Sequence, residues 1–174
     1  MRRLLLMRHA KSSWDEPALA DHDRPLAPRG LRDAPRMGRW LVRKELLPDR
    51  ILCSTARRAR QTCEAVRAEL PAPPEALVLP QLYEFGRITP LLDAIAHHGG
   101  DARTLLVVGH NEALHELALH LAASGSGNDM SEMHRKFPTA AVAVLELDGG
   151  DWPSALERRG RLTRFMRPKK LRES

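Results

Sequence analysis

Short apolar segments alternate with amphipathic helical patterns along most of this chain. The strand candidates are the apolar runs at 4–7, 50–53, 77–79, 105–108 and 140–147. The segments between them carry helical spacing, for which the clearest stripe is Leu114, Leu117, Ala118, Leu121 and Ala122. Alternation of this kind, with short strands that are apolar on both faces, predicts a three-layer α/β/α sandwich around a mainly parallel sheet.

The length of 174 residues suits a single domain spanning 1–174, and no internal repeat is present. We expect a helix over 30–47, with a kink or a late start because Pro35 removes a backbone hydrogen bond. The stretch 124–129 is rich in Ser, Gly, Asn and Asp and predicts a loop. The basic residues at about 167–174 predict a flexible end.

Composition narrows the classes of partner. A net charge of +6 favours anionic partners, but only three Trp, one Tyr and three Phe are present, so a nucleic-acid binder with stacking aromatics is disfavoured. No apolar run approaches the ~20 residues that span a bilayer, and the apolar run after Met1 is too short for a signal peptide. Cys53 and Cys63 form no disulfide framework, and Cys53 lacks the arginine spacing of cysteine phosphatases, so we expect a buried Cys53 and a cytoplasmic protein.

Polar residues follow three of the expected strands directly. The first strand ends in Arg8-His9-Ala10-Lys11-Ser12, the second runs into Ser54-Thr55-Ala56-Arg57, and the fourth ends in Gly109-His110-Asn111. Ligands of open parallel sheets bind at the carboxyl ends of the strands, so two histidines and several arginines are expected to converge at one edge.

Such a set of side chains suits phosphoryl transfer. Arginine donates two parallel hydrogen bonds to phosphate and stays charged, and nearby guanidinium groups disfavour protonation of an imidazole. A neutral histidine beside arginines is therefore a candidate nucleophile, held by cations that neutralise the phosphoryl oxygens.

The ordered set of motifs resembles the histidine phosphatase superfamily, and most closely its branch of SixA-type phosphohistidine phosphatases. The residues that carry the resemblance are Arg8-His9, Asp23-Arg24-Pro25-Leu26, Ser54 with an approximate Arg57-Ala-x-Gln-Thr, Gly109-His110-Asn111 and Lys136-Phe137-Pro138-Thr139. It extends over roughly residues 3 to 145 and implies a phosphoglycerate mutase-like fold.

The resemblance implies a role for each member of the pocket. His9 would form a phosphohistidine intermediate, Arg8 and Arg57 would bind the phosphoryl oxygens, and His110 would donate to the developing charge. Ser12 and Asn111 are further candidates for substrate binding. Arg58 and Arg60 are expected in solvent, since a helical step of 100° turns them away from Arg57.

The proton donor for the leaving group is the open question of this site. Mutase-like relatives have a glutamate after the third strand, which makes Glu84 a candidate, whereas acid-phosphatase relatives have an aspartate where this chain has Asn111. A phosphoramidate substrate relaxes the need for a positioned acid, because its nitrogen can be protonated before P–N cleavage, whereas an alkoxide leaving group needs such an acid. We therefore expect a phosphatase that removes phosphate from phosphohistidine on a protein, without metal or cofactor.

Two alternatives remain open at this stage. The first is a phosphomonoesterase or mutase of the same superfamily that acts on a small phosphorylated metabolite and uses Glu84 as its acid. The second is a non-catalytic module that binds phosphate. Trp14 follows the first histidine motif, and we expect it to pack a loop against the core, with a lid over the pocket as the alternative.

Overall fold

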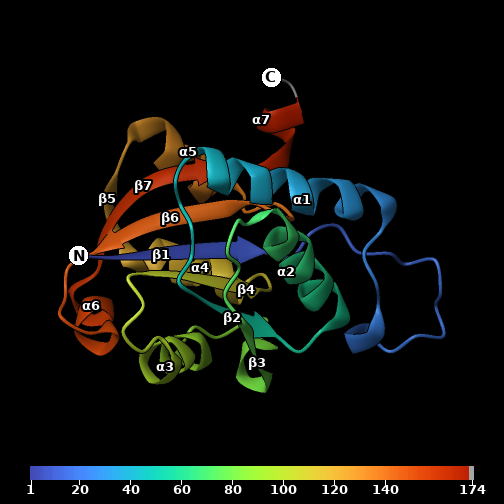
Figure 1. Ribbon diagram of the computed structural model, residues 1–174, viewed down its shortest axis with the longest axis horizontal. Helices are drawn as coiled ribbons and strands as arrows, with labels where there is room; N and C mark the ends of the chain where they lie inside the picture. Colours follow the sequence, from blue (N-terminus) through green and yellow to red (C-terminus); the bar gives the residue numbers. More distant parts are fainter. Residues whose placement is uncertain (173–174) are drawn as a thin grey trace.

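The computed structural model describes residues 1–172 and is built around one central sheet (Figure 1). Its strands lie in the order β3-β2-β4-β1-β6-β7-β5. They are β1 (Arg2–Arg8), β2 (Arg50–Ser54), β3 (Ala76–Leu79), β4 (Thr104–Gly109), β5 (Ala122–Gly125), β6 (Val142–Leu147) and β7 (Gly160–Met166). The strands from β3 to β1 are parallel to their neighbours, as are β5 and β7, while β6 runs antiparallel to β1 and β7. The sheet is thus mainly parallel, as predicted.

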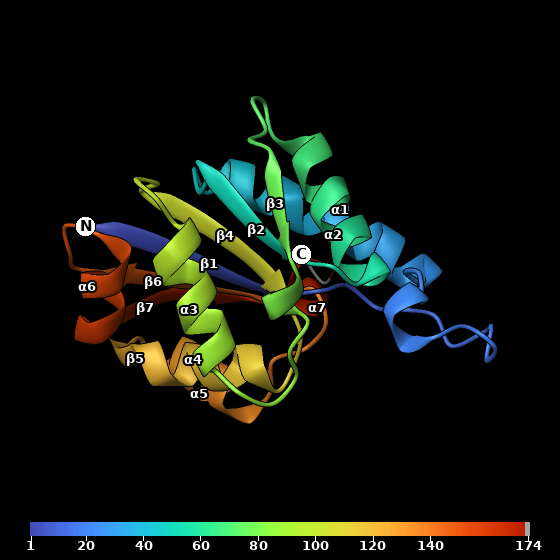
Figure 2. The same cartoon turned by 90° about the horizontal axis from the view of Figure 1, so that it is seen from below.

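Helices cover both faces of this sheet. They are α1 (Pro28–Arg43), α2 (Arg57–Glu69), α3 (Thr89–His98), α4 (Ala113–Leu121), α5 (Gly127–Arg135), α6 (Trp152–Arg158) and α7 (Pro168–Arg172), with short 3-10 turns at Asp21–Asp23 and Pro80–Leu82. Figure 2 shows α1 and α2 on one side of the sheet and α4 and α5 on the other. No helix within residues 1–172 is long and apolar enough to cross a membrane.

The central strand β1 shows why the chain folds into three layers. Leu4 and Leu6 belong to the apolar cluster that includes α3, α4 and α6, whereas Leu5 and Met7 belong to the cluster with α1 and α2. Side chains alternate between the faces of a strand, so a strand that is apolar at every position needs cover on both sides. The all-apolar runs of the sequence therefore become the buried centre of the sheet.

Two strands and one helix fall outside the pattern that the sequence predicts. β5 includes Ser124 and Gly125, where we expected a loop, and β7 alternates buried residues such as Leu162 and Phe165 with exposed arginines. The helix α6 lies between β6 and β7. The strands β5 and β7 lack the four-residue apolar runs of the central strands, because they lie toward one edge of the sheet.

The basic end also differs from its prediction. Pro168–Arg172 forms α7 instead of a flexible tail, because Leu171 packs against the cluster under α1 and Arg172 pairs with Asp33 at 3.6 Å. Residues 173–174 lie outside the described part of the chain. The helix α1 begins at Pro28, earlier than expected, and continues through Pro35. The first turn of α1 packs against the backbone carbonyl of Lys11 at Gly30. A Cβ atom at this position would clash with that carbonyl oxygen, so the close approach requires glycine.

Candidate functional site

The carboxyl ends of β1 and β4 bring the two candidate histidines together. These neighbouring parallel strands pair Arg8 with Gly109, and the His9 amide donates to the Gly109 carbonyl at 3.1 Å. Each histidine is therefore the first residue beyond a paired position, and the two ring centroids lie 5.1 Å apart. The strand-end argument from the sequence predicts this juxtaposition correctly.

The imidazole of His9 is buried and oriented by the backbone carbonyl of the next residue. Its Nδ1 lies 2.7 Å from the Ala10 carbonyl, which only accepts, so Nδ1 carries the proton and Nε2 keeps its lone pair. Burial lowers the pKa of His9 to about 3, and the positive charges of Arg58, Arg8 and Arg24 add to the effect. The ring is consequently neutral at physiological pH, with Nε2 as its basic atom.

His110 is held by a hydroxyl at the end of β2. Its Nε2 lies 2.8 Å from Ser54 Oγ, which also accepts a hydrogen bond from the Ala56 amide at 3.2 Å. When the Ser54 hydroxyl accepts from the Ala56 amide and donates its own proton to Nε2, both of these hydrogen bonds form. The proton of His110 then lies on Nδ1. Nδ1 is buried and has no hydrogen-bond partner within residues 1–172. The pKa of His110 is lowered to about 2. Burial is the main cause, and the neighbouring His9 lowers it further.

Arg8 and Asn111 share one anchor in the segment before β6. Arg8 Nη1 donates to the Phe137 carbonyl at 3.1 Å, and Asn111 Nδ2 donates to the same carbonyl at 2.9 Å. Arg8 Nε and Asn111 Oδ1 are buried without a partner among the described residues. Both residues line the pocket with His9, so the structure brings these two predicted members to the site.

The second arginine of the pocket is Arg58, and the prediction of a solvated Arg58 is wrong. Its side chain is 2% exposed, and its Nε donates to His9 Nε2 at 3.4 Å. Arg57 is exposed and lies outside the pocket lining, and its side chain donates at 3.5 Å to the Asp23 carbonyl. The phase of α2 explains the difference, because the helix begins at Arg57 and turns its second residue toward β1. Arg60 is exposed, as expected.

The sequence itself carries a signal for Arg58. The run Arg58-Ala59-Arg60-Gln61-Thr62 fits the Arg-Ala-x-Gln-Thr pattern without a gap, whereas a match that starts at Arg57 is one residue out of step. Thr62 links this turn of α2 to the first strand: its Oγ1 donates to the Arg58 carbonyl at 2.7 Å and accepts from the Ala10 amide at 3.0 Å.

Asp21 connects three side chains around the pocket. Its Oδ2 accepts from Arg58 Nη2 at 3.0 Å and from the Tyr83 hydroxyl at 2.6 Å, while its Oδ1 accepts from Arg24 at 3.2 Å. The pKa of this carboxyl is lowered to about 2, because hydrogen bonds from Tyr83 and Arg58 outweigh the opposing effect of burial. No local sequence pattern marks Asp21 as a member of the site, since Arg58 and Tyr83 lie 37 and 62 residues away along the chain.

The loop after β1 contributes Ser12, Trp14 and Arg24. Arg24 Nη1 donates to Ser12 Oγ at 2.8 Å, which fixes the predicted substrate-binding hydroxyl at the edge of the pocket. The guanidinium of Arg24 also lies 3.5 Å from the centre of the Trp14 ring. Trp14 is 69% exposed, so the expected packing of this residue against the core is wrong and its ring forms part of the pocket rim.

Together these groups enclose a pocket of about 270 Å³. Its lining consists of Arg8, His9, Lys11, Ser12, Trp14, Asp21, Arg24, Arg58, Phe85, His110, Asn111 and Thr139. Four of these side chains are cations and one is a carboxylate, so the pocket attracts a compact anion. The exposed rings of Trp14 and Phe85 belong to the same lining and offer apolar contact to a group attached to that anion.

The structure does not bring Glu84 into this pocket. Its carboxylate accepts from the amides of Gly86 at 3.1 Å and Arg87 at 3.2 Å and pairs with the Arg87 side chain at 3.3 Å. These backbone hydrogen bonds, led by that of Gly86, lower the pKa of Glu84. Glu84 thus closes the turn after Pro80–Leu82 as an anion, which makes it unsuited to donate a proton.

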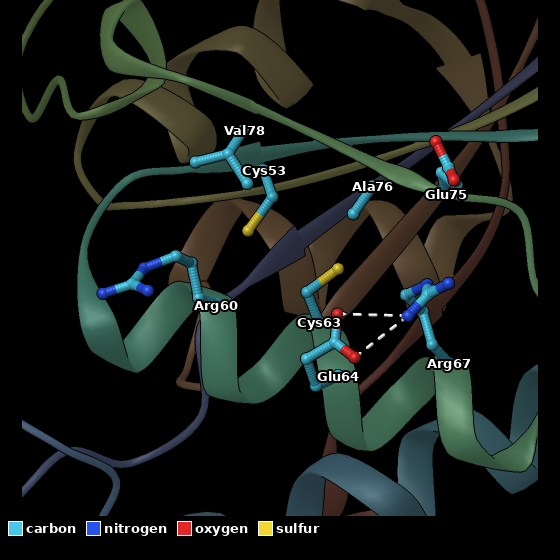
Figure 3. Close-up of a pocket in the computed structure, with 8 residues that line it drawn as sticks. All are labelled: Cys53, Arg60, Cys63, Glu64, Arg67, Glu75, Ala76 and Val78. Carbon is cyan, nitrogen blue, oxygen red and sulfur yellow. Dashed lines mark hydrogen bonds and ion pairs between the residues drawn. The ribbon is translucent and has the colours of Figure 1, made fainter.

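A second hollow, of about 360 Å³, lies between α2 and β3 and shares no lining residue with the pocket around His9. Figure 3 shows Cys53 and Cys63 on adjoining elements, with their sulfur atoms directed into the space between α2 and the sheet. Contact with Cys63 and burial raise the pKa of the Cys53 thiol. Cys53 is fully buried, as predicted, and a thiol that stays protonated is a poor nucleophile.

Comparison with known proteins agrees with this geometry. Residues 4–88 match the family model of the histidine phosphatase superfamily (branch 1). The chain is 44% identical over 146 residues to a protein of Mycobacterium tuberculosis H37Rv described as uncharacterized, covering 82% of this chain and 88% of that protein. It is 30% identical over 149 residues to the phosphohistidine phosphatase SixA of Escherichia coli K12, covering 84% of this chain and 86% of that protein.

Solved structures extend the similarity to the whole fold. A candidate phosphohistidine phosphatase SixA from Nakamurella multipartitia superposes with a TM-score of 0.82 at 32% identity, covering 96% of each chain. A structure of the protein histidine phosphatase SixA complexed with tungstate gives a TM-score of 0.76 at 28% identity, covering 97% of this chain and 99% of that one. The fold is that of the phosphoglycerate mutase-like proteins, and the chain is a phosphatase that belongs to the histidine phosphatase superfamily.

Proposed function

We propose that this phosphatase hydrolyses phosphohistidine on a protein through a covalent intermediate on His9. The choice of substrate rests on the proton donors that the pocket offers to a leaving group. Among the described residues that line the pocket, the one carboxyl group is that of Asp21, and Arg58, Arg24 and Tyr83 hold it as an anion. A P–N bond breaks without a positioned acid, since the leaving imidazole is already protonated on its other nitrogen.

In the first step, Nε2 of His9 attacks phosphorus in line with the leaving group. The Nε2–P bond forms as the P–N bond of the substrate breaks, and the electron pair of that bond stays on the departing imidazole. The Nδ1–H of His9 remains hydrogen bonded to the Ala10 carbonyl, which stabilises the positive charge that develops on the ring. The substrate histidine leaves as a neutral imidazole.

The cations of the pocket neutralise the phosphoryl oxygens during this transfer. Arg58 lies beside Nε2, and the buried Nε of Arg8 and Nδ1 of His110 have no partner among residues 1–172. Fixed donors of this kind stabilise the transition state because they need no reorganisation when charge moves onto the oxygens. We assign the phosphoryl oxygens to Arg8, Arg58 and His110, and Ser12 and Asn111 to the rim of the same site.

The second step regenerates the enzyme. A water molecule attacks phosphorus, the Nε2–P bond breaks, and its electron pair returns to Nε2. The products are neutral His9 and dihydrogen phosphate, so no further proton is needed.

The experiment that tests this function compares substrates under identical conditions. The full chain is incubated with a phosphohistidine-containing protein, with sugar phosphates and with p-nitrophenyl phosphate, and phosphate release is measured. We expect the highest kcat/KM for phosphohistidine and an acid-labile, base-stable phosphoenzyme that is absent from His9→Ala. Preference for sugar phosphates would instead support the small-molecule alternative, and binding without any turnover would support the non-catalytic one.

A further inference from the structure

A cationic depression of about 240 Å³ adjoins the phosphate pocket, and the two share Thr139 in their linings. Its positive side chains come from α1, from the segment before β6 and from the chain after β7. We call this set the basic pocket: Arg29, Lys136, Arg167, Lys169 and Arg172. None of these residues belongs to the machinery around His9.

The segment 136–139 fixes the basic pocket relative to the nucleophile. The Phe137 carbonyl accepts from Arg8 and Asn111, and the Ala140 amide donates to the carbonyls of Arg8 and His9, both at 3.0 Å. Lys136 and Thr139 therefore extend from a strip of backbone that is bonded to the end of β1. A ligand that reaches from one pocket to the other meets cations at a set position.

The C-terminal cations are also held in place. Lys170 pairs with Glu132 at 2.9 Å, Arg172 pairs with the buried Asp33 at 3.6 Å, and Leu171 packs against the apolar cluster under α1. Figure 1 shows the resulting helix α7 beside α1. These contacts keep Lys169 and Arg172 beside the active site instead of leaving them at a frayed end.

The charges of the basic pocket are not balanced within the described chain. Asp33 is the one carboxylate in its lining, and it is already paired with Arg36 at 2.7 Å and with Arg172. Arg29, Lys136 and Lys169 are exposed, and no acidic side chain of residues 1–172 pairs with them. Clustered like charges repel one another and destabilise the fold, which an anionic partner would relieve.

We propose that the basic pocket binds acidic side chains next to the phosphorylated residue of a protein substrate. This proposal rests on the proposed function and adds a specificity site to it. Exposed lysines and arginines on flexible stems create a field that steers and orients a charged surface. The exposed cations Arg29, Lys136 and Lys169 come from three separate segments of the chain, so spaced carboxylates of a peptide can each contact one of them.

The test uses two phosphohistidine peptides that differ only in three flanking residues, all Glu in one and all Gln in the other. We expect the wild-type chain to show a kcat/KM about 10-fold higher for the Glu peptide at low salt, through KM. The preference should shrink as ionic strength rises from about 50 to 300 mM, because screening weakens exposed charge pairs.

Matched variants locate the effect. Lys136→Gln with Lys169→Gln removes two positive charges from the basic pocket, and Arg43→Gln with Lys44→Gln removes two from the other end of α1, about 20 Å away along the helix. The first pair should abolish the preference for Glu and leave the Gln peptide and p-nitrophenyl phosphate unaffected. The second pair should keep the preference.

Three results would overturn the proposal: no preference in the wild type, equal loss in both double variants, or an equal loss on the Gln peptide. If the wild type hydrolyses neither phosphohistidine peptide, the proposed function fails, and the basic pocket is judged separately. Phosphoserine peptides with the same flanks are then tested as inhibitors of p-nitrophenyl phosphate hydrolysis. Stronger inhibition by the Glu peptide supports the basic pocket, and equal inhibition overturns it.

Discussion

Asp21 holds Arg58 through two different atoms, its carbonyl oxygen at 2.7 Å from Nη1 and its carboxylate Oδ2 at 3.0 Å from Nη2. This double contact leaves Nε of Arg58 directed at His9 Nε2, 3.4 Å away. The loop after β1 thereby sets the position of a cation that belongs to α2. A residue that touches no reacting atom is thus expected to control the phosphoryl clamp.

Replacement of Asp21 tests this relationship. Asp21→Asn should lower kcat about 10-fold, because the neutral amide pairs more weakly with Arg58 and Arg24. Asp23→Asn is the control, since Asp23 is 63% exposed and lies outside the pocket lining. Steady-state kinetics on p-nitrophenyl phosphate measures both. Equal rates for Asp21→Asn and the wild type would show that Arg58 keeps its position without the carboxylate.

The two neighbouring arginines of α2 should differ sharply in their contribution to catalysis. Arg58→Ala should lower kcat/KM by about 10²–10³-fold, the loss typical of removing one donor to a developing oxyanion. Arg57→Ala should change it by less than about 3-fold, since Arg57 is exposed and outside the pocket. A larger loss for Arg57→Ala would restore the assignment made from the sequence.

Glu84 provides a direct test of the leaving-group argument. Glu84→Gln should leave kcat on both phosphohistidine and p-nitrophenyl phosphate within about 2-fold, because the carboxylate closes a turn with Gly86 and Arg87 outside the pocket. Folding is checked by the thermal midpoint of each protein. A selective loss on p-nitrophenyl phosphate in a folded variant would identify Glu84 as an acid and support the mutase-like alternative.

The two buried histidines should make stability depend on pH. The pKa values of His9 and His110 are lowered from 6.5 to about 3 and about 2, so the unfolded chain binds more protons than the folded chain as the pH falls below 6.5. The free energy of unfolding should therefore fall with falling pH, by about 1 kcal/mol for each histidine between about pH 6 and pH 5. Urea unfolding measures it.

A variant isolates the histidine contribution from that of the carboxyl groups. His9→Gln removes one of the two groups, so its loss of stability over this interval should be smaller than that of the wild type by about 1 kcal/mol. Identical slopes in the two proteins would mean that folding does not lower the pKa of His9, which contradicts the burial of its ring as the cause of a neutral imidazole.

The centre of the fold was predictable because it is encoded locally. Strands buried on both faces, such as β1 and β4, must be apolar at every position, and this signal survives in a single sequence. The strand β7 buries only Leu162 and Phe165 fully, and β5 has four residues with a register shift. Such strands form because the backbone of a neighbouring strand offers free hydrogen-bonding groups at the edge of the sheet. The local sequence of β5 or β7 does not indicate this pairing.

The site was predictable to the extent that strand ends define it. His9, Arg8 and His110 follow directly from the parallel order of β1 and β4. Arg58 was missed because helical phase alone leaves the choice between neighbouring arginines open to one residue, although the ungapped Arg-Ala-x-Gln-Thr match begins at Arg58. The role of Asp21 could not be read from the sequence, because its contacts with Arg58 and Tyr83 join distant segments.

The pocket is built from two structurally different halves. His9 and His110 extend from the buried centre of the sheet, whereas Ser12, Trp14, Asp21 and Arg24 lie in the loop between β1 and α1, which reaches away from the sheet in Figure 1. Changes in that loop can reshape the entrance without disturbing the packing that holds the nucleophile. Asp21 is the exception in this loop, because it holds Arg58 in the pocket. Substitutions at other positions of the loop can therefore alter the choice of substrate while the chemistry at His9 stays the same.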